Sequence, residues 1–424
     1  MKRSVNVCLG EAGTPVGSLN FDATGQRQSV AFAYASTWLA DPARFALSPD
    51  LPLVSGYQYR ANKVNRATGE STFFACFADS EPDGWGRKVI LRDHAKQRLE
   101  SGGVAGRQAS AEPLNDFDFL LRVNDISRVG AIRLQDENGV FQRASGQKRD
   151  TPTLVALPDL LTASKAVEQG RETARDLVYL RGNGTSLGGL RPKCSIIDAD
   201  GSLAIGKFPS VADTRSIVHG EVLALNLAAT AGIRAAKARV VDAQGVSVAV
   251  ITRFDRVNDA QRNTKRLMYL SARSLLQAAG DQQYTYVDIA NAIRMHSSQA
   301  ALDLVELWRR MVFNILINNV DDHLNNHGFL HVAHDQWLLA PAFDVNPFPD
   351  KERALKTWIS DDAGDAASVD QALAAAPFFG FSQSAANAVL NDIQSAVKNW
   401  KSMARGIGMT AGDLEAYAPA FLGH

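Results

Sequence analysis

The sequence has few cysteines, no excess of either charge and no long apolar segment, and each absence excludes a class of protein. The three cysteines, Cys8, Cys76 and Cys194, are far apart and odd in number, which argues against a disulfide framework and fits a reducing compartment. Lys plus Arg and Asp plus Glu both number 45, so the chain offers no bulk positive field for binding nucleic acid by itself. No segment approaches the roughly eighteen uninterrupted apolar residues of a membrane span. We therefore expect a cytoplasmic protein with no membrane partner.

The length of 424 residues allows two or three domains with sizeable cores. Strand-like and helical periods alternate in the first third of the chain. They predict a strand over Ser4–Leu9, helices over Gly86–Gln97 and Asp116–Val123, an exposed loop over Ser101–Glu112 and a strand over Gly130–Leu134. The polar, proline-broken stretch Lys148–Thr153 predicts a domain boundary near residue 150.

The middle of the chain predicts a small sheet-rich lobe. We expect strands over Leu177–Leu180, Lys193–Ile197 and Leu203–Phe208, a glycine-rich loop over Gly182–Gly189 and an Asp-Gly turn at Asp198–Gly201. A helix over Val218–Ala229 and two strands around Gly245 follow. Beyond Leu270 helical spacing dominates, most clearly in Leu275–Ala279, Tyr286–Arg294 and Leu302–Ile317. The sequence thus predicts an α+β protein in which a sheet-rich lobe precedes a helical lobe.

The segment Phe313–Asp344 contains the residue types that phosphoryl transfer needs. An apolar helical run ends in a polar loop that holds Asp321 and, five positions on, Asn326, while Asp344 follows a short hairpin. The first acid can accept the proton of an attacking hydroxyl, and the amide and the second acid can supply hard oxygen ligands for magnesium. A kinase is therefore the leading hypothesis. The alternative is that Asp and Asn gather here because loops favour them.

A glycine-rich run and a lysine could complete such a site. The backbone of Gly182–Gly189 could come close to phosphate oxygens, since glycine has no side chain to clash. Its spacing does not match a Walker A loop, and an ordinary surface turn is the alternative. Lys207 lies in an apolar strand, where an ammonium group is costly unless it meets an anion such as a nucleotide phosphate. The alternative is an edge-strand lysine that discourages aggregation.

Four histidines follow the candidate catalytic acid at intervals that resemble metal-ligand spacing on a helix: His323, His327, His331 and His334. Gly328 and a strand-like pair after it break any helix, and in a strand His334 would point away from His331. A transition-metal site is therefore not favoured. His323 could instead touch nucleotide phosphates, or form a hydrogen bond within its own loop.

Taken together, ordered motifs along nearly the whole chain resemble the HipA family of bacterial serine/threonine kinase toxins. The first part contributes Leu51-Pro52-Leu53 and Pro82-Asp83-Gly84-Trp85-Gly86-Arg87. The rest contributes Thr185–Gly189 through Lys193, Lys207-Phe208-Pro209, Arg253–Arg256, Asn319–His323 with Asn326, and Ala342-Phe343-Asp344. The resemblance implies a two-lobed protein-kinase-like fold: an N-terminal β-rich subdomain over residues 1–150, a kinase-like N-lobe with a glycine-rich phosphate loop over 151–265, and a helical C-lobe with the catalytic loop over 266–424.

The resemblance also implies roles for individual residues. Asp321 is expected to be the catalytic base, with Asn326 and Asp344 as Mg²⁺ ligands. Contacts to ATP are expected from Gly184, Thr185, Ser186, Gly188, Gly189, Lys193, Lys207, Thr252, Phe254 and His323, of which Thr252 to Phe254 would line the adenine. Ser186 is the expected autophosphorylation site, with Thr185 as the alternative acceptor. A phosphate at Ser186 would compete with ATP for the same backbone amides and so inactivate the enzyme.

The biology that the resemblance implies is a toxin that phosphorylates a translation component, with aminoacyl-tRNA synthetases as the known target class. A small helix-turn-helix antitoxin would accompany it, and operator DNA would be contacted mainly through that antitoxin, in agreement with the neutral charge balance. Two other classes stay open: a catalytically idle binding module that represses transcription with its antitoxin, and a small-molecule or lipid kinase. The complete set Lys207, Asp321, Asn326 and Asp344 favours an active kinase.

Overall fold

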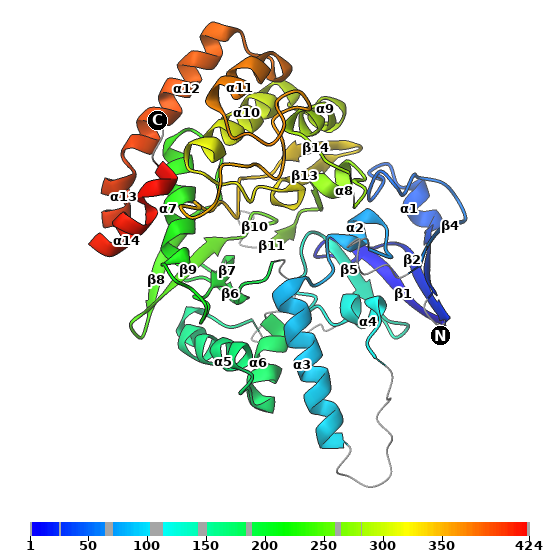
Figure 1. Cartoon of the computed structure of the whole chain (residues 1–424). Coiled ribbons are helices and arrows are strands. Elements are labelled where there is room, and N and C mark those ends of the chain that lie inside the picture. The colour runs from blue at the N-terminus through cyan, green and yellow to red at the C-terminus, as the bar shows by residue number, and fades with distance from the viewer. Residues whose placement is uncertain are drawn as a thin grey trace. The chain divides into compact units, whose positions relative to one another are not determined.

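A computed structural model of the chain confirms a mixed α+β protein (Figure 1). It describes residues 2–24, 27–63, 71–101, 113–142, 151–183, 189–258, 264–280 and 282–421. The chain forms two compact units, the first made of Met1–Ala212 and Asp242–Met268 and the second of Asp213–Val241 and Tyr269–His424. Within the described ranges no helix is long and apolar enough to cross a membrane. The division into three domains with a boundary near residue 150 stays a prediction.

The first unit opens with an antiparallel sheet of five strands in the order β4-β3-β2-β1-β5. The strands are β1 Lys2–Leu9, β2 Thr14–Thr24, β3 Arg27–Tyr34, β4 Tyr57–Lys63 and β5 Ile132–Gln135. Val5, Leu19 and Phe32 lie opposite one another on β1, β2 and β3, and all three are buried. Their common face forms a core because directly opposed residues point to the same side of a sheet. The strand predicted from Ser4 is confirmed by β1, and the one predicted from Gly130 is confirmed in part by β5.

Four helices accompany this sheet: α1 Ser36–Ala40, α2 Ala75–Ala78, α3 Gly84–Ser101 and α4 Asp116–Leu121. The ring of Phe117 on α4 stacks on Phe21 of β2, with centroids 5.0 Å apart. Asn115 and Asp118 form a reciprocal capping box that starts α4. The helices predicted over Gly86–Gln97 and Asp116–Val123 are thus confirmed. The loop predicted to follow α3 falls on residues 102–112, outside the described part of the chain.

The second sheet has four strands in the order β6-β7-β9-β8. They are β6 Lys193–Ile197, β7 Leu203–Lys207, β8 Ala238–Ala243 and β9 Val246–Thr252, and a short hairpin of β10 Arg256–Asn258 and β11 Thr264–Arg266 follows. The predicted β6–β7 hairpin is confirmed. In its turn the Gly201 N–H donates to the Asp198 carbonyl at 2.9 Å. Gly201 has a φ of +84°, which glycine adopts without strain.

The strand predicted over Leu177–Leu180 is wrong, because these residues belong to a helix. The 3-10 helix η1 Leu154–Ala156 leads into α5 Leu157–Gln169, and α6 Ala174–Asn183 follows and packs against α3 and α5. The start of α6 is fixed by Thr173 and Asp176, whose side chains each accept a hydrogen bond from the other's backbone N–H, at 3.2 and 2.8 Å. This Thr-x-x-Asp pattern was the available signal for a helix.

The second unit is mainly helical, with one small antiparallel sheet in the order β12-β13-β14. Its helices are α7 Ile217–Thr230, α8 Ala272–Leu275, α9 Tyr286–His296, α10 Ala300–Leu316, α11 Val369–Ala375, α12 Gln383–Lys398, α13 Trp400–Gly406 and α14 Ala411–Tyr417. The 3-10 helices are η2 Leu324–Asn326, η3 Ala376–Phe379 and η4 Ala418–Phe421, and the strands are β12 Tyr269–Ser271, β13 Gly328–Ala333 and β14 Gln336–Leu339.

The helices predicted to begin at Val218, Tyr286 and Leu302 are confirmed by α7, α9 and α10. The helix predicted over Leu275–Ala279 is wrong, since α8 ends at its first residue. Gln277 has a φ of +50°, a left-handed conformation that terminates a helix.

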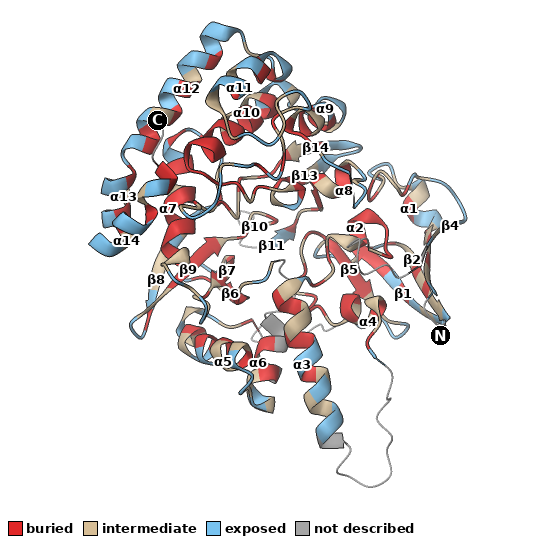
Figure 2. Cartoon of the chain, viewed as in Figure 1, coloured by how far each residue is buried: buried red, intermediate tan, exposed pale blue. Residues whose placement is uncertain are grey.

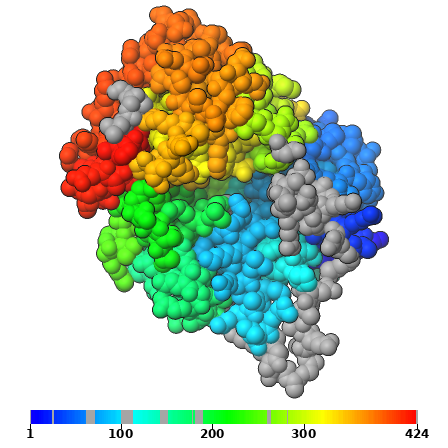
Figure 3. Space-filling model, in the orientation of Figure 1, coloured from blue at the N-terminus to red at the C-terminus, as the bar shows by residue number. Residues whose placement is uncertain are grey.

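Helix α10 is the core of the second unit, and Figure 2 shows it buried along most of its length. The Trp308 side chain is fully buried, and its Nε1 donates to the Ala372 carbonyl of α11 at 3.0 Å. Helices α9, α11 and α12 contact α10, and the orange and red C-terminal segment forms an outer surface of this unit (Figure 3). Because α10 is held on several sides, the loop that leaves its C-terminus starts from a fixed point.

Candidate active site

The polar loop after α10 is held by the side chains of its own asparagines. Asn318 has a φ of +53°, a left-handed conformation that asparagine tolerates better than most residues and that ends the helix. Its Nδ2 donates to the Phe348 carbonyl at 2.6 Å. Asn319 Nδ2 donates to Asn314 Oδ1 on α10 at 3.0 Å. The loop is thereby tied to α10 and to the segment that follows Asp344.

Asp322 is a buried acid that accepts hydrogen bonds from three side chains. The donors are the Tyr286 hydroxyl on α9, Asn314 Nδ2 at 3.0 Å and His327 Nε2 at 2.8 Å. Burial alone would raise the pKa of Asp322, but His327 and the Tyr286 hydrogen bond outweigh it and hold the pKa below its usual value. Since an ionised carboxylate can only accept, His327 Nε2 carries the proton. This buried network fixes the shape of the loop.

Asp321, the adjacent acid, has the opposite environment. Its side chain is 37% exposed, and its Oδ1 contacts Lys356 Nζ and lies 3.9 Å from Lys351 Nζ. The Lys356 backbone is placed by its N–H, which donates to the Val320 carbonyl at 3.2 Å. Of the two neighbouring acids, Asp322 is buried within the loop, and Asp321 is the one that is partly exposed to solvent.

The two expected magnesium ligands lie in the same unit as Asp321. Asn326 Nδ2 donates to the Asp321 carbonyl at 3.4 Å. Asp344 has a φ of +55°, a conformation that costs a non-glycine residue about 1 kcal/mol or more and often occurs at functional sites. The described residues contain no group of three or more His, Cys, Asp or Glu placed to hold a metal. An amide and a carboxylate still fit magnesium, which usually takes one or two protein ligands and completes its shell with water and phosphate oxygens.

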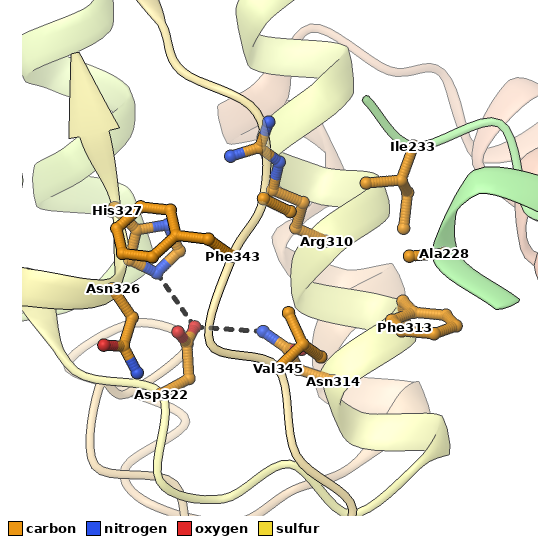
Figure 4. Close-up of a pocket in the computed structure, with 11 residues that line it drawn as sticks. Ala228, Ile233, Arg310, Phe313, Asn314, Asp322, Asn326, His327, Phe343 and Val345 are labelled. Atoms are coloured by element: carbon orange, nitrogen blue, oxygen red, sulfur yellow. Dashed lines mark hydrogen bonds and ion pairs between the residues drawn. The ribbon is translucent and has the colours of Figure 1, made fainter. Parts of the chain in front are cut away.

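A small pocket lies behind the loop, and Figure 4 shows Asp322 between His327 and Asn314, with Asn326 beside it. Phe343 and Val345, the neighbours of Asp344, line it as well. Its volume is about 10 Å³, close to the least space that one water molecule needs. The pocket is therefore too small for a nucleotide and belongs to the packing that supports the loop.

In the first unit, Lys193 and Lys207 are directly opposite each other on β6 and β7. Directly opposed residues share a face of the sheet, and like charges in that position repel each other. Lys193 is only 5% exposed. Two lysines on one face of a sheet favour a nearby anion, and a nucleotide phosphate has the right charge.

Four of the expected nucleotide contacts, Gly184, Thr185, Ser186 and Gly188, lie outside the described residues. Gly189 is described and has a φ of +89°. A Cβ atom built on Gly189 would lie 2.7 Å from Lys193 Nζ. The absence of a side chain at Gly189 thus lets the Lys193 ammonium group approach the backbone closely.

The expected adenine hinge begins at the end of β9, where Thr252 is opposite Ala204 of β7. Phe254 follows, between the buried residues Arg253 and Asp255. Arg253 Nε donates to Asp255 Oδ1 at 2.8 Å, and the Gly130 N–H donates to Asp255 Oδ2 at 2.8 Å. Burial opposes ionisation of Asp255, but the charges of Arg253 and the following arginine hold its pKa far below the usual value. The hinge segment is therefore fastened to the turn before β5.

Among the described residues, the four histidines do not form a group that could hold a metal ion. His323 Nδ1 is buried without a hydrogen-bond partner in the described part of the chain, so its contact with phosphates stays a prediction. His327 bonds Asp322. His331 Nε2 lies 2.6 Å from the His334 carbonyl, and its ring packs edge-on against Trp337.

Sequence reasoning missed the side chains that support the loop. Asn314 was detectable as a polar residue inside the apolar α10 segment. Tyr286 lies 36 positions before Asp322, and nothing in the sequence connects the two. Lys356 likewise carries no local signal.

Two family models match the chain. One, described as the HipA-like C-terminal domain, matches residues 185–400, and the other, described as the HipA N-terminal domain, matches residues 5–135. A protein named "Putative kinase Y4mE" from Sinorhizobium fredii is 25% identical over 356 residues, which are 78% of this chain and 75% of that protein. A protein named "Putative kinase" from Haemophilus influenzae is 32% identical over 111 residues, 24% of this chain and 32% of its own length.

Among solved structures, the complex of HipA, HipB and operator DNA from the Shewanella oneidensis MR-1 toxin–antitoxin system contains a similar chain. The TM-score is 0.64 at 16% identity, and the match covers 98% of this chain and 95% of that chain. At this identity the likeness concerns the fold alone, and it confirms the fold that the sequence motifs imply.

Proposed function

The chain belongs to the HipA family, and from this premise we propose that it is an ATP-dependent serine/threonine protein kinase that acts as the toxin of a bacterial toxin–antitoxin module. The C-terminal family model alone covers residues 185–400, more than half of the 424 residues. A relative that aligns over 78% of this chain carries the name "Putative kinase Y4mE".

The observation that carries the proposal is the contrast between Asp321 and Asp322. A single acid in a loop has no obvious role, but here the second acid is buried and saturated by Tyr286, Asn314 and His327. Burial of the Asp322 carboxylate costs desolvation energy, which these three hydrogen bonds offset, and they hold the loop in one geometry. The geometry presents Asp321 at the surface, where it can accept the proton of an acceptor hydroxyl.

The other residues take complementary roles in the proposal. Bound ATP with magnesium would supply the phosphoryl group and neutralise part of its charge. Asn326 and Asp344 hold the magnesium, and Lys193 and Lys207 attract the phosphates. Thr252 and Phe254 line the adenine, and Gly189 allows the close approach of backbone to phosphate. His323 assists at the phosphates.

The partners are proposed from the family. A related HipA has been solved with HipB and operator DNA, and we propose that a HipB-like helix-turn-helix antitoxin binds this chain and makes most of the DNA contacts. Equal numbers of acidic and basic residues support an indirect role in DNA binding. The substrate would be a translation component such as an aminoacyl-tRNA synthetase, and both partners would be met in the cytoplasm.

Autophosphorylation at Ser186, with Thr185 as the alternative, is proposed from the sequence motif. A dianionic phosphate at that position would compete with ATP phosphates for backbone amides and for Lys193 and Lys207. The modified protein would then be an inactive kinase.

The test is to incubate the purified protein with ATP and magnesium and to map phosphate by intact mass and peptide analysis. The parent should gain phosphate at Ser186 and transfer it to a protein substrate, whereas Asp321→Asn should gain none. Asp335→Asn, a change at an exposed acid of the β13–β14 turn, should behave like the parent. Binding of ATP without any phosphoprotein would favour the idle binding module. Consumption of ATP only when a metabolite is added would favour a small-molecule kinase.

A further inference from the structure

The motif Pro82–Arg87 lies at the start of helix α3, within the region that the N-terminal family model covers. None of its residues takes part in the proposed phosphoryl transfer. Its backbone nevertheless contacts the last residue of the glycine-rich run. The Trp85 N–H donates to the Gly189 carbonyl at 2.9 Å. The Gly189 N–H donates to Asp83 Oδ2 at 3.3 Å. Both backbone polar groups of Gly189 are therefore held, one by Asp83 just before α3 and the other by Trp85 in its first turn.

Gly84 is the residue that makes this approach possible. A Cβ atom built on Gly84 would lie 2.6 Å from the Gly189 carbonyl oxygen and 3.0 Å from Leu190 Cα. Real Cβ atoms essentially never lie this close to backbone atoms, so the backbone would have to move. Any side chain at position 84 would therefore push the two segments apart.

The other flank of Gly189 is occupied by Lys193, whose Nζ would be 2.7 Å from a Cβ atom built on Gly189. Gly189 thus lies between the start of α3 and a buried lysine of β6. A shift of Gly189 would change the surroundings of that ammonium group directly.

Arg87 holds the turn in the shape that these contacts need. Its Nε donates to the Pro82 carbonyl at 3.0 Å, and its Nη2 donates to Glu81 Oε1 at 3.2 Å. Its guanidinium carbon lies 4.4 Å from the ring centroid of Phe119 on α4, a cation–π contact. The motif therefore contains three residues that contact Gly189 and an arginine that supports them.

We propose that the turn Pro82–Arg87 is a positioning element for nucleotide binding: it fixes the backbone of Gly189 and, through it, Lys193. Asp83, Gly84 and Trp85 are then positioning residues, which act on the nucleotide through Gly189 without touching it. This inference rests on the proposed binding of ATP at Lys193, but it does not require transfer of phosphate to a protein. It also gives the N-terminal region a direct function in the kinase.

The test is the affinity of the whole protein for a non-hydrolysable ATP analogue with magnesium, measured by calorimetry beside the melting temperature. Gly84→Ala should weaken binding about tenfold or more. The control is Gly201→Ala, which places alanine at an unfavourable φ of +84°. A Cβ atom built on Gly201 has no neighbouring atom within 4 Å. The control should lose stability and keep its affinity.

Asp83 provides a second variant that avoids a folding defect, because its side chain is exposed. Asp83→Ala removes the acceptor for the Gly189 N–H and should weaken binding about fivefold, the size expected for one hydrogen bond. Asp83→Asn keeps an acceptor oxygen and should restore the affinity. In an active kinase the loss should appear in the KM for ATP more than in kcat.

The proposal is overturned if Gly84→Ala and Asp83→Ala bind the analogue as the parent does, or if the parent does not bind it. Normal analogue binding by the parent without any phosphoprotein would refute the kinase assignment alone, and the affinities of the variants would still decide the positioning role.

Discussion

Lys356 holds its ammonium nitrogen against a carboxylate oxygen of Asp321, the acid proposed to receive the hydroxyl proton. Lys351 Nζ is 3.9 Å from the same oxygen and lies 3.7 Å from the ring centroid of Phe348. Lys356 thus contacts the acid directly, whereas Lys351 is placed mainly by the ring of Phe348.

Lys356→Ala is expected to lower kcat about tenfold, because the cation that orients the Asp321 carboxylate is lost. Lys356→Arg should recover part of the rate, since it restores the positive charge with a different shape. Lys351→Ala is the matched comparison and should change kcat by less than about threefold. Steady-state kinetics at saturating ATP measure all three. Equal effects of the two alanine changes would refute the distinction between these lysines.

Asp322→Ala is expected to destabilise the protein by about 3–5 kcal/mol, because it leaves Tyr286, Asn314 and His327 as buried donors without their acceptor. Asp321→Ala should cost less than about 1 kcal/mol, since that side chain is partly exposed. Urea denaturation of the two variants measures the difference. Similar losses for both would mean that the buried network does not support the loop.

Asp344→Gly and Asp344→Ala both remove the proposed magnesium ligand and should both abolish magnesium-dependent phosphorylation. The free energy of unfolding should be about 1 kcal/mol higher for Asp344→Gly than for Asp344→Ala, because only glycine adopts a φ of +55° without strain. Denaturation midpoints and a kinase assay on the same samples test this. A more stable alanine variant would contradict it.

Glu81 predicts a pH dependence of stability. Burial raises its pKa to about 7, although Ser71 and Arg87 favour the charged form. In the folded protein Glu81 therefore keeps a proton that the unfolded chain releases near pH 4.5. The contribution of protonated Glu81 to the free energy of unfolding is complete below pH 4.5 and is lost as the pH rises through about 7. Glu81→Gln, which imitates the protonated form, should reduce the loss of unfolding free energy between pH 5 and pH 8 by about 1–2 kcal/mol.

The matched control for that experiment is Glu137→Gln, a change at an exposed glutamate of the same unit. It should leave the pH dependence of the unfolding free energy as in the parent. An unchanged slope in Glu81→Gln would contradict the assignment of the proton to Glu81.

Elements with a strong local pattern could be predicted from the sequence. The β6–β7 hairpin follows from apolar alternation around an Asp-Gly turn, and α10 follows from sixteen residues of helical spacing between Leu302 and Ile317. The segment Leu177–Leu180 could not be assigned by periodicity, because four apolar-rich residues fit both a strand and a helix turn. There the capping pair Thr173 and Asp176 decides the outcome.

The candidate site was predictable only where its residues belong to one motif. Asp321 and Asn326 stand five positions apart, and their resemblance to a family suffices to single them out. The contacts of Asp322 with Tyr286, and of Gly84 with Gly189, join residues far apart in the chain. No local pattern encodes such pairs, since they depend on how whole helices pack.

The hydrogen bond from Trp85 to Gly189 joins two backbone groups across 104 positions of the chain. Any residue except proline can donate it, so substitutions at position 85 need no compensating change at position 189. Homologous sequences should therefore show no covariation between positions 85 and 189, and the contact should be marked by an unvarying glycine at position 84 and by a side-chain acceptor at position 83. Exchange of N-terminal regions between relatives would therefore preserve this one hydrogen bond as long as that glycine is kept, whatever residue other than proline stands at position 85.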